Sequence, residues 1–320
     1  MKSVLNQQQN NTLQELLGRG FEQFAHLEKF TTAHVGGPAD AVCIANDSAA
    51  LERICTLLWQ WQVPFRVLGK GSNILVSDVG LHEVAIINRS KTIRFDKESN
   101  PPTVFAESGV NFGGLARQAA IHGLSGLEWV NSVPGTVGGG VYGNAGAHGS
   151  DTQQSLMMAD ILHPIHGKQQ VPASEMHYEY RSSIYKRNKE QVIILSATFR
   201  LEQSTRELVE AKMASFSEHR QNTQPPGASL GSMFKNPPGD YAGRLIEAAG
   251  LKGTKIGGAE ISSKHANFFL NDESATAQDI YQLIELARTT VKQKFNCDLE
   301  LEIELIGDWT KSNADALEKK

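Results

Sequence analysis

The stretch VNSVPGTVGGGVYGNAGAHG (130–149) contains seven glycines in twenty residues. It is not a flexible linker, because valines and a tyrosine stand among the glycines, and Gly/Ser spacers lack such residues. It is not a common nucleotide fingerprint either, since no GxGxxG motif opens a helix and no Lys-Ser follows a P-loop glycine. The pattern indicates a folded segment whose bare backbone must approach another group closely.

Two further glycine-rich segments precede it, VGGPAD (35–40) and LGKGSN (68–73). LGKGSN joins the apolar segments 65–68 and 74–77, and such a turn can direct several backbone N–H groups at one anion. By itself it is better explained as a tight β-turn, and the glycines of 130–149 as bulges and bends. Three such segments in one region favour a dinucleotide cofactor held by loops rather than at the end of a Rossmann helix.

Composition places the chain among globular proteins of about two domains. It has 320 residues, of which 40% are hydrophobic and 21% charged, and a net charge of −4 that argues against a nucleic-acid surface. No apolar run approaches the ~18 residues of a membrane helix, and the polar N-terminus is not a secretory signal. Three widely separated cysteines predict inert thiols in the cytoplasm, and no metal-ligand spacing occurs, so we expect no metal.

Apolar periodicity predicts a mixed α and β chain. The first part should contain helices at 11–27, 48–61 and 112–122 and strands at 65–68, 74–77, 84–88, 103–106 and 192–201. Residues 202–228 form a boundary with one helix. Asp240 is expected to cap a helix that runs to Gly250, and Thr276 and Asp279 a second helix with a buried face. The alternating LELEIEL (299–305) predicts a half-buried strand, and 308–320 a mobile tail.

These elements predict an N-terminal helical segment (1–29), a large α+β domain (30–202), a smaller α+β domain (203–307) and a polar tail (308–320). We expect a cleft between the two domains, because ligand sites are often found at domain interfaces.

Three isolated residues are candidates for chemistry: Arg181, Ser232 and Glu302. Each has a plainer explanation, as a surface arginine, a turn serine, or one carboxylate of a solvated strand face. We accept the solvated face for the flanking Glu300 and Glu304. No Ser-His-Asp or Cys-His arrangement is evident.

Taken together, the segments resemble one family, the UDP-N-acetylenolpyruvoylglucosamine reductases. The resemblance runs in order from Phe30 to Gly307. The segments that carry it are TTAHVGGPAD (31–40), VLGKGSNILVSD (67–78), GLSGLEWVNSVPGTVGGGVYGNAGAHG (123–149), YRSS (180–183), GSMFKNP (231–237), AGRLIEAAGLKG (242–253), IGGAEISSKHANFFLN (256–271) and LELEIELIG (299–307).

The resemblance implies an FAD-binding domain of the vanillyl-alcohol-oxidase type, followed by a smaller α+β substrate-binding domain. The short segment after YRSS is similar to the compact subtype, which lacks an extra tyrosine-bearing loop. Two residues depart from the family pattern, Gly143 where methionine is common and His148 where tyrosine is common. The implied FAD-binding residues are Gly69, Lys70, Gly71, Ser72, Asn73, Pro134, Gly135, Thr136, Gly138, Gly139, Asn144 and Gly146.

The implied reaction uses NADPH to reduce the enolpyruvyl ether of a UDP-sugar to a lactyl ether, in peptidoglycan precursor synthesis. By resemblance, Ser232 protonates C2, while Arg181 and Glu302 position and stabilise the enol form. Lys235 and Asn236 are expected to contact substrate. The implied partners are UDP-N-acetylglucosamine enolpyruvate and NADPH, with neither nucleic acid nor membrane, and the protein is expected to be a monomer or weak oligomer.

Two other readings stay open at this point. A flavin-dependent sugar or alcohol oxidase would account for the glycine loops, but not for Arg181, Ser232 and Glu302 in this context. A nucleotide-sugar-binding protein without activity would have no need of Ser232 or Glu302.

Overall fold

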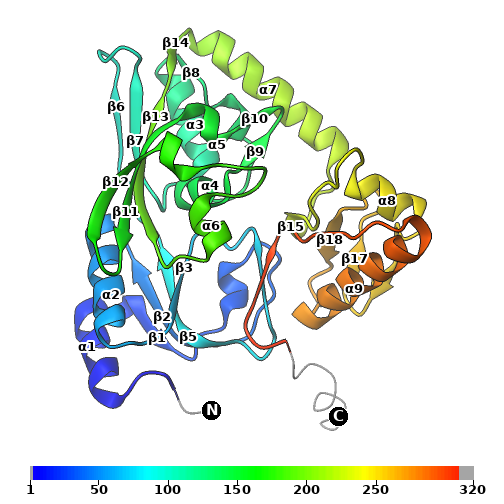
Figure 1. Ribbon diagram of the computed structural model, residues 1–320, viewed down its shortest axis with the longest axis horizontal. Coiled ribbons are helices and arrows are strands. Elements are labelled where there is room, and N and C mark those ends of the chain that lie inside the picture. Colours follow the sequence, from blue (N-terminus) through cyan, green and yellow to red (C-terminus); the bar gives the residue numbers. More distant parts are fainter. Residues whose placement is uncertain (1–2, 310–320) are drawn as a thin grey trace.

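The structure of the protein is a computed structural model, of which residues 3–309 are described (Figure 1). One four-stranded sheet has the order β1-β2-β5-β3, in which β2, β5 and β3 run parallel and β1 is antiparallel. Its strands are β1 (Phe21–Gln23), β2 (Ala39–Ala45), β5 (Leu81–Asn88) and β3 (Phe65–Leu68). Parallel strands need crossover connections, and α2 (Ser48–Gln60) supplies the one between β2 and β3.

A second, five-stranded sheet is antiparallel throughout, in the order β12-β11-β13-β7-β6. Its strands are β6 (Ile93–Asp96), β7 (Thr103–Glu107), β11 (Leu156–His163), β12 (Gly167–Pro172) and β13 (Ile193–Arg200). The apolar face of α2 packs in one cluster with β2 and β5 and also with Leu162 and Leu195 of the second sheet. On α3 (Phe112–Ile121), the predicted apolar stripe is buried.

Shorter elements fill the space around these two sheets. They are α1 (Gln7–Leu17), β4 (Ile74–Val76), β8 (Leu124–Ser125), α4 (Val137–Gly143), β9 (Gly146–Ala147), β10 (Ser150–Asp151), α5 (Thr152–Ser155), α6 (Ile184–Asn188) and β14 (Glu202–Gln203), with 3₁₀ turns at Gly18–Gly20, Leu27–Phe30, Glu128–Val130 and Ala173–Met176.

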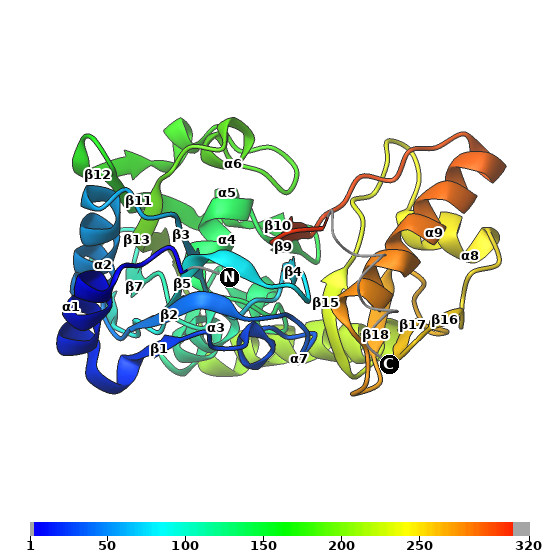
Figure 2. The same ribbon diagram turned by 90° about the horizontal axis from the view of Figure 1, so that it is seen from below.

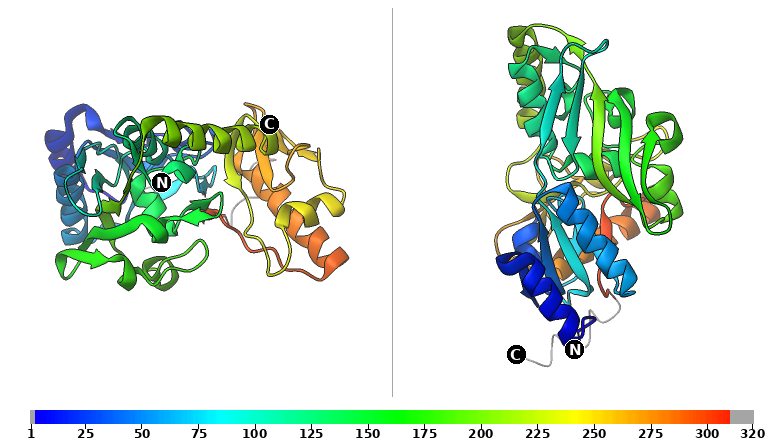
Figure 3. Two further views of the ribbon diagram at one scale, coloured as in Figure 1. Left: turned by 90° about the horizontal axis from the view of Figure 1, so that it is seen from above. Right: turned by 90° about the vertical axis from the view of Figure 1, so that its left-hand side faces the viewer.

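The C-terminal part is built on an antiparallel sheet of order β15-β18-β17-β16. These strands are β15 (Ala228–Ser232), β16 (Lys255–Ile256), β17 (Ala259–Ile261) and β18 (Phe268–Asn271), and α8 (Ala242–Ala248) and α9 (Ala277–Phe295) lie beside them (Figure 2). The long helix α7 (Arg206–Thr223) reaches from the first part to the second (Figures 1 and 3). The predicted capping box of Thr276 and Asp279 is present, and the predicted apolar face of α9 is buried.

Several contacts join the two parts. Ala33, Val35 and Leu75 belong to the hydrophobic core of the C-terminal part. The carboxylate of Asp78 accepts hydrogen bonds from the first two backbone N–H groups of α9, both at 2.9 Å. The last strand, β19 (Glu304–Ile306), returns to pair in parallel with β4 (Figure 2). Strand β19 is therefore built into the first part.

Some sequence predictions were wrong in detail. The first helix covers 7–17 rather than 11–27, because Asn6 and Gln9 form a capping box there and β1 then joins the sheet. Asp240 does not cap α8 from the N-cap position; it pairs with Arg244 and accepts from the Tyr241 N–H. Within 299–305 only residues from Glu304 onward are in a strand.

The predicted mobile tail is also partly wrong. Trp309 stacks on Tyr281 with ring centroids 4.9 Å apart, and Asp308 accepts a hydrogen bond from Ser77 Oγ. The rest of the tail, 310–320, lies outside the described residues. The domain borders proposed from sequence remain predictions.

Candidate functional site

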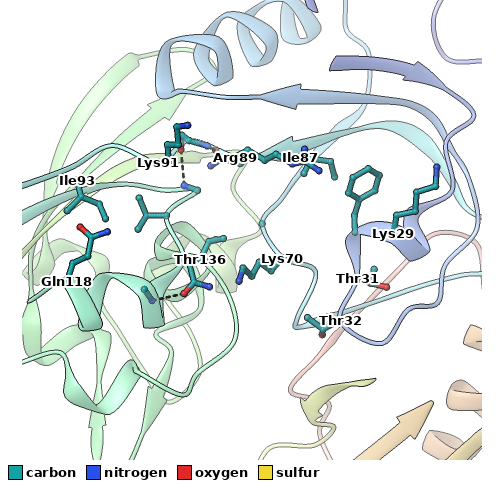
Figure 4. Close-up of a pocket in the computed structure, with 18 residues that line it drawn as sticks. Lys29, Thr31, Thr32, Lys70, Ile87, Arg89, Lys91, Ile93, Gln118 and Thr136 are labelled. Atoms are coloured by element: carbon teal, nitrogen blue, oxygen red, sulfur yellow. Dashed lines mark hydrogen bonds between the residues drawn. The ribbon is translucent and has the colours of Figure 1, made fainter. Parts of the chain in front are cut away.

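A cavity of about 540 Å³ lies where the two sheets of the first part meet. Its walls come from residues 29–32, 69–70, 87–91 and 109–111, together with Ile93, Gly114, Gln118 and Thr136. Figure 4 shows Ile93 and Gln118 at one end, Lys29, Thr31 and Thr32 at the other, and Lys70 and Thr136 between them. The segments after β3 and β5 belong to the carboxyl ends of parallel strands, where α/β sheets commonly bind ligands.

The charge of this cavity is one-sided. Its lining includes Lys29, Lys70, Arg89 and Lys91, and none of the lining residues is an aspartate or glutamate. A cavity of this size with four cations on its wall suits a ligand that carries phosphate groups. These residues therefore fit a dinucleotide such as FAD.

Three of the residues predicted to bind FAD line the cavity: Gly69, Lys70 and Thr136. Segments 88–91 and 109–111 were missed. Two hydrogen bonds join this part of the chain: Asn88 Nδ2 donates to Ser108 Oγ at 2.7 Å, and the Gly109 N–H donates to Ser90 Oγ at 2.9 Å. Each segment comes at the end of a predicted strand, but the sequence does not show that the two ends meet, because β5 and β7 belong to different sheets.

The two predicted glycine loops touch each other. A Cβ on Gly69 would lie 2.5 Å from Thr136 Oγ1, and Ser72 Oγ donates to Pro134 O at 3.3 Å. Gly71 has φ of +60°, and a Cβ there would lie 2.3 Å from Phe30 O. The fold itself therefore requires glycine at residue 71, whether or not it also faces the cofactor.

The stretch 137–143, predicted as loop, is the short helix α4. Four of its seven residues are glycine, which disfavours a helix. Close packing explains the choice: a Cβ on Gly140 would lie 2.6 Å from the Phe112 ring, and one on Gly138 2.8 Å from Ser108 Cβ.

Asn144 and Gly146, also predicted to bind FAD, are engaged within the protein. Asn144 ends α4 in a left-handed conformation, is buried, and donates to Glu179 O at 3.1 Å. Gly146 O accepts a hydrogen bond from Arg181 Nη1 at 2.7 Å. Ser72, Asn73, Pro134, Gly135 and Gly139 are near the cavity in sequence but are not in its lining.

Arg181 and Glu302, which are 121 positions apart in sequence, form an ion pair with Nε 3.0 Å from Oε1. Arg181 is in a left-handed backbone conformation, with φ of +58°. Its Nε faces Glu302 and its Nη1 donates to Gly146 O, so these two contacts fix the orientation of the guanidinium. The positive charge and the Nη2 group are what the guanidinium can offer to an anionic group of a ligand.

Glu302 is only 15% exposed in its side chain. Burial raises the pKa of its carboxyl, while the neighbouring cations Arg181, Lys186 and Lys235 act in the opposite direction. A carboxylate held among three cations in a buried setting is typical of functional sites, although structural networks also have this character.

Main-chain pairing brings the Ser232–Lys235 segment beside Glu302. The Glu302 N–H donates to Met233 O at 3.0 Å, and the Lys235 N–H donates to Glu300 O at 2.8 Å. Ser232 ends β15, is half-buried, and follows Gly231 with φ of +76°.

A buried amide also holds this segment. Asn267 Oδ1 accepts from the Phe234 N–H at 2.9 Å, and Asn267 Nδ2 donates to Phe234 O at 2.8 Å. Asn267 was not singled out from the sequence, since a lone asparagine carries no distinctive signal.

Two expectations about neighbouring residues can be compared with the structure. Glu300 is solvated as expected, with a side chain 73% exposed although it pairs with Lys235, whereas Glu304 is 38% exposed and pairs with Lys186. Asn236 uses its Oδ1 to accept the Ala242 N–H at the start of α8, and its contact with substrate stays a prediction.

His148 stacks on Phe216 of α7, with ring centroids 4.3 Å apart and planes 12° apart. Burial, aided by His219 and Arg220, lowers the pKa of the His148 imidazole. Among residues 3–309 no cluster of three or more His, Cys, Asp or Glu could hold a metal ion. In the same range, no helix combines the length and apolar character that crossing a membrane requires.

Comparison with known proteins agrees with this geometry. A family model described as "FAD binding domain" matches residues 39–164. A second, "UDP-N-acetylenolpyruvoylglucosamine reductase, C-terminal domain", matches residues 221–306. The chain is therefore a two-domain FAD-binding flavoprotein. This confirms the predicted fold class, an FAD-binding domain followed by a smaller α+β domain.

Relatives identify the family within this class. The UDP-N-acetylenolpyruvoylglucosamine reductase of Bacillus velezensis is 38% identical over 302 residues, covering 93% of this chain and 98% of the relative. That of Chloroflexus aggregans is 39% identical, covering 88% and 95%. The crystal structure of the Thermus caldophilus enzyme aligns with a TM-score of 0.76 at 33% identity, covering 88% and 98%. The chain belongs to the UDP-N-acetylenolpyruvoylglucosamine reductase family, an oxidoreductase family.

Proposed function

We propose that this protein uses NADPH to reduce UDP-N-acetylglucosamine enolpyruvate to UDP-N-acetylmuramate, in the cytoplasm. The observation that carries the proposal is the buried Arg181–Glu302 pair beside the Ser232–Lys235 segment. The chemistry that FAD supplies when bound is hydride transfer, from NADPH and on to C3 of the enolpyruvyl double bond.

Reduction of this double bond leaves negative charge on C2 and on the adjacent carboxylate. Arg181 is the residue that stabilises this charge, through its guanidinium, which Glu302 and Gly146 O hold in place. Glu302 orients the guanidinium together with Gly146 O. Lys235 adds a second positive charge from the Ser232–Lys235 segment.

Ser232 donates the proton that C2 needs. A hydride and a proton thus add across the double bond, NADPH is oxidised to NADP⁺, and the serine oxygen regains its proton from solvent. Because a hydroxyl is a weak acid, the nearby cations assist by stabilising the alkoxide that the transfer leaves behind.

The deciding experiment follows the flavin absorbance of Ser232→Ala through two separate steps. NADPH is added without oxygen and bleaching is recorded, and then the enolpyruvyl substrate is added and recovery is recorded. We expect normal bleaching and a recovery slowed roughly 10²–10⁴-fold. Ser232→Cys, which keeps a donor, should be less affected. Ser229→Ala, on the same strand, is the control.

Other outcomes exclude the proposal or part of it. Equal slowing of both steps in Ser232→Ala would show that the residue supports a turn and does not donate the proton. Wild-type protein that ignores NADPH but is reduced by a sugar or alcohol and reoxidised by oxygen would be an oxidase. Protein that shows neither step would be a binder.

A further inference from the structure

Lys186 forms a second ion pair next to the Arg181–Glu302 pair. It lies on α6, five positions after Arg181, and its Nζ is 3.1 Å from Glu304 Oε1. Its side chain is only 19% exposed, which is low for a lysine. Arg181 and Lys186 of one short segment therefore pair with Glu302 and Glu304, which lie two positions apart in another.

The backbone around Lys186 is fixed in place. Ser183 Oγ accepts the Lys186 N–H at 3.3 Å and donates to Tyr142 O at 2.7 Å, so α6 is tied to α4. Ser183 is fully buried. A lysine on such an anchored turn loses less freedom in forming its pair than a lysine on an open surface.

The carboxylate partners are fixed from the other side. The Glu304 N–H donates to Asn73 O at 2.9 Å, and Asn73 Nδ2 donates to Glu302 O at 3.2 Å. The segment 302–304 is thus held between the glycine turn at 69–73 and the 181–186 segment.

We propose that Lys186, through its pair with Glu304, is a positioning residue that holds Glu302 in contact with Arg181. The inference rests on the proposed function, in which the Arg181 guanidinium must be held facing the substrate. Without Lys186, Glu304 loses its ion-pair partner, because the other cation of α6, Arg187, pairs with Glu179. The segment that carries Glu302 then loses one of its anchors.

The charges around Glu302 give this proposal a direction in pH. The groups that face the 302–304 carboxylates are Arg181 and Lys186 from the 181–186 segment, Lys235 after β15, and Tyr142 on α4. Removing the Lys186 charge takes away a cation that opposes the effect of burial, so the pKa of Glu302 must rise. Removing the Glu304 charge takes away a neighbouring anion, and the pKa of Glu302 must not rise.

The test compares Lys186→Met, Lys186→Arg and Glu304→Gln as FAD-loaded proteins. For Lys186→Met we expect kcat to fall about 10- to 100-fold, from displacement of Arg181, with FAD content and the NADPH step unchanged. The acid limb of its pH–rate profile should move to higher pH. Lys186→Arg should restore most of the rate. Glu304→Gln should lose rate without an upward move of the limb.

Lys252→Met is the matched control. Lys252 is 29% exposed and pairs with Glu247 at 2.8 Å, away from this network, so its profile should match wild type. If Lys186→Met and Glu304→Gln move the acid limb in the same direction, or if Lys186→Arg is as impaired as Lys186→Met, the positioning role is wrong.

A second measurement separates this inference from the proposed function. The pKa of Glu302 is read from carboxyl ¹³C shifts in protein labelled at glutamate, with Glu302→Gln identifying the signal. A rise in Lys186→Met supports the inference even if the wild type fails to reduce the enolpyruvyl substrate, and an unchanged pKa overturns it. Inactivity of wild type with that substrate contradicts only the proposed function.

Discussion

Asn267 holds the Ser232–Lys235 segment through two hydrogen bonds, and its replacement should have a large and calculable effect. Asn267→Ala leaves both the N–H and the C=O of Phe234 unpaired, and Phe234 is fully buried. An unsatisfied buried polar group costs about 1–3 kcal/mol, so the two together amount to about 2–6 kcal/mol. That is a large share of the 5–15 kcal/mol typical of a whole domain.

Asn267→Asp gives a finer test, because it is nearly isosteric. The carboxylate can still accept the Phe234 N–H, but it places an anionic oxygen where Nδ2 now donates to Phe234 O. Protonation of the new carboxyl restores a donor. Its pKa in the folded state must therefore lie above the unfolded value, and the stability lost at neutral pH must return as the pH falls.

Urea unfolding followed by circular dichroism measures both effects, with an unchanged m value as the sign that only stability changed. Asn271→Ala is the control, because it removes another buried asparagine, whose Nδ2 donates to Ala33 O, without touching the Ser232–Lys235 segment. Asn267→Ala within 1 kcal/mol of wild type, or Asn267→Asp with no recovery at low pH relative to wild type, would refute the reasoning.

Three further predictions concern other parts of the molecule. Asp78→Ala removes two acceptors at the start of α9 and should lower the free energy of unfolding by about 1–2 kcal/mol, which urea titration measures; no loss would mean that solvent replaces the carboxylate fully. Gly71→Ala should destabilise even FAD-free protein, because its Cβ meets Phe30 O and its φ is positive; a loss confined to FAD content would contradict this. Burial raises the pKa of Glu302 in the folded state, so the free energy of unfolding of wild type should fall relative to Glu302→Gln as the pH rises from about 4.5 through that pKa. A difference in unfolding free energy that does not change with pH would exclude the raised pKa.

The elements that could be predicted from sequence are those whose burial is visible as a period. Helices α2, α3 and α9 and strands β3 and β5 follow their apolar spacing, and Thr276 with Asp279 marks a start. Helix α4 could not be predicted, because four glycines argue against a helix and only the Phe112 ring behind Gly140 explains them.

The site was predictable to a different degree. Arg181 and Glu302 were isolated candidates whose roles came only from a family resemblance, since no spacing connects residues so far apart. Lys186 and Asn267 carried no signal, because a lysine and an asparagine become informative only when their partners are known. The cations Arg89 and Lys91 were missed because they follow β5 and lie outside the glycine-rich segments on which the prediction of the cofactor site rested.

The return of β19 to β4 has a consequence for the order in which the protein is made. All residues that line the cavity with the four cations lie between Lys29 and Thr136, and Glu302 is synthesised about 170 residues after Thr136. At 5–20 residues per second, this interval is roughly 10–30 s. The cavity is therefore synthesised well before the carboxylate that pairs with Arg181. A chain that stops before Glu302 retains the cavity residues but lacks both the carboxylate that pairs with Arg181 and the strand β19 that follows it.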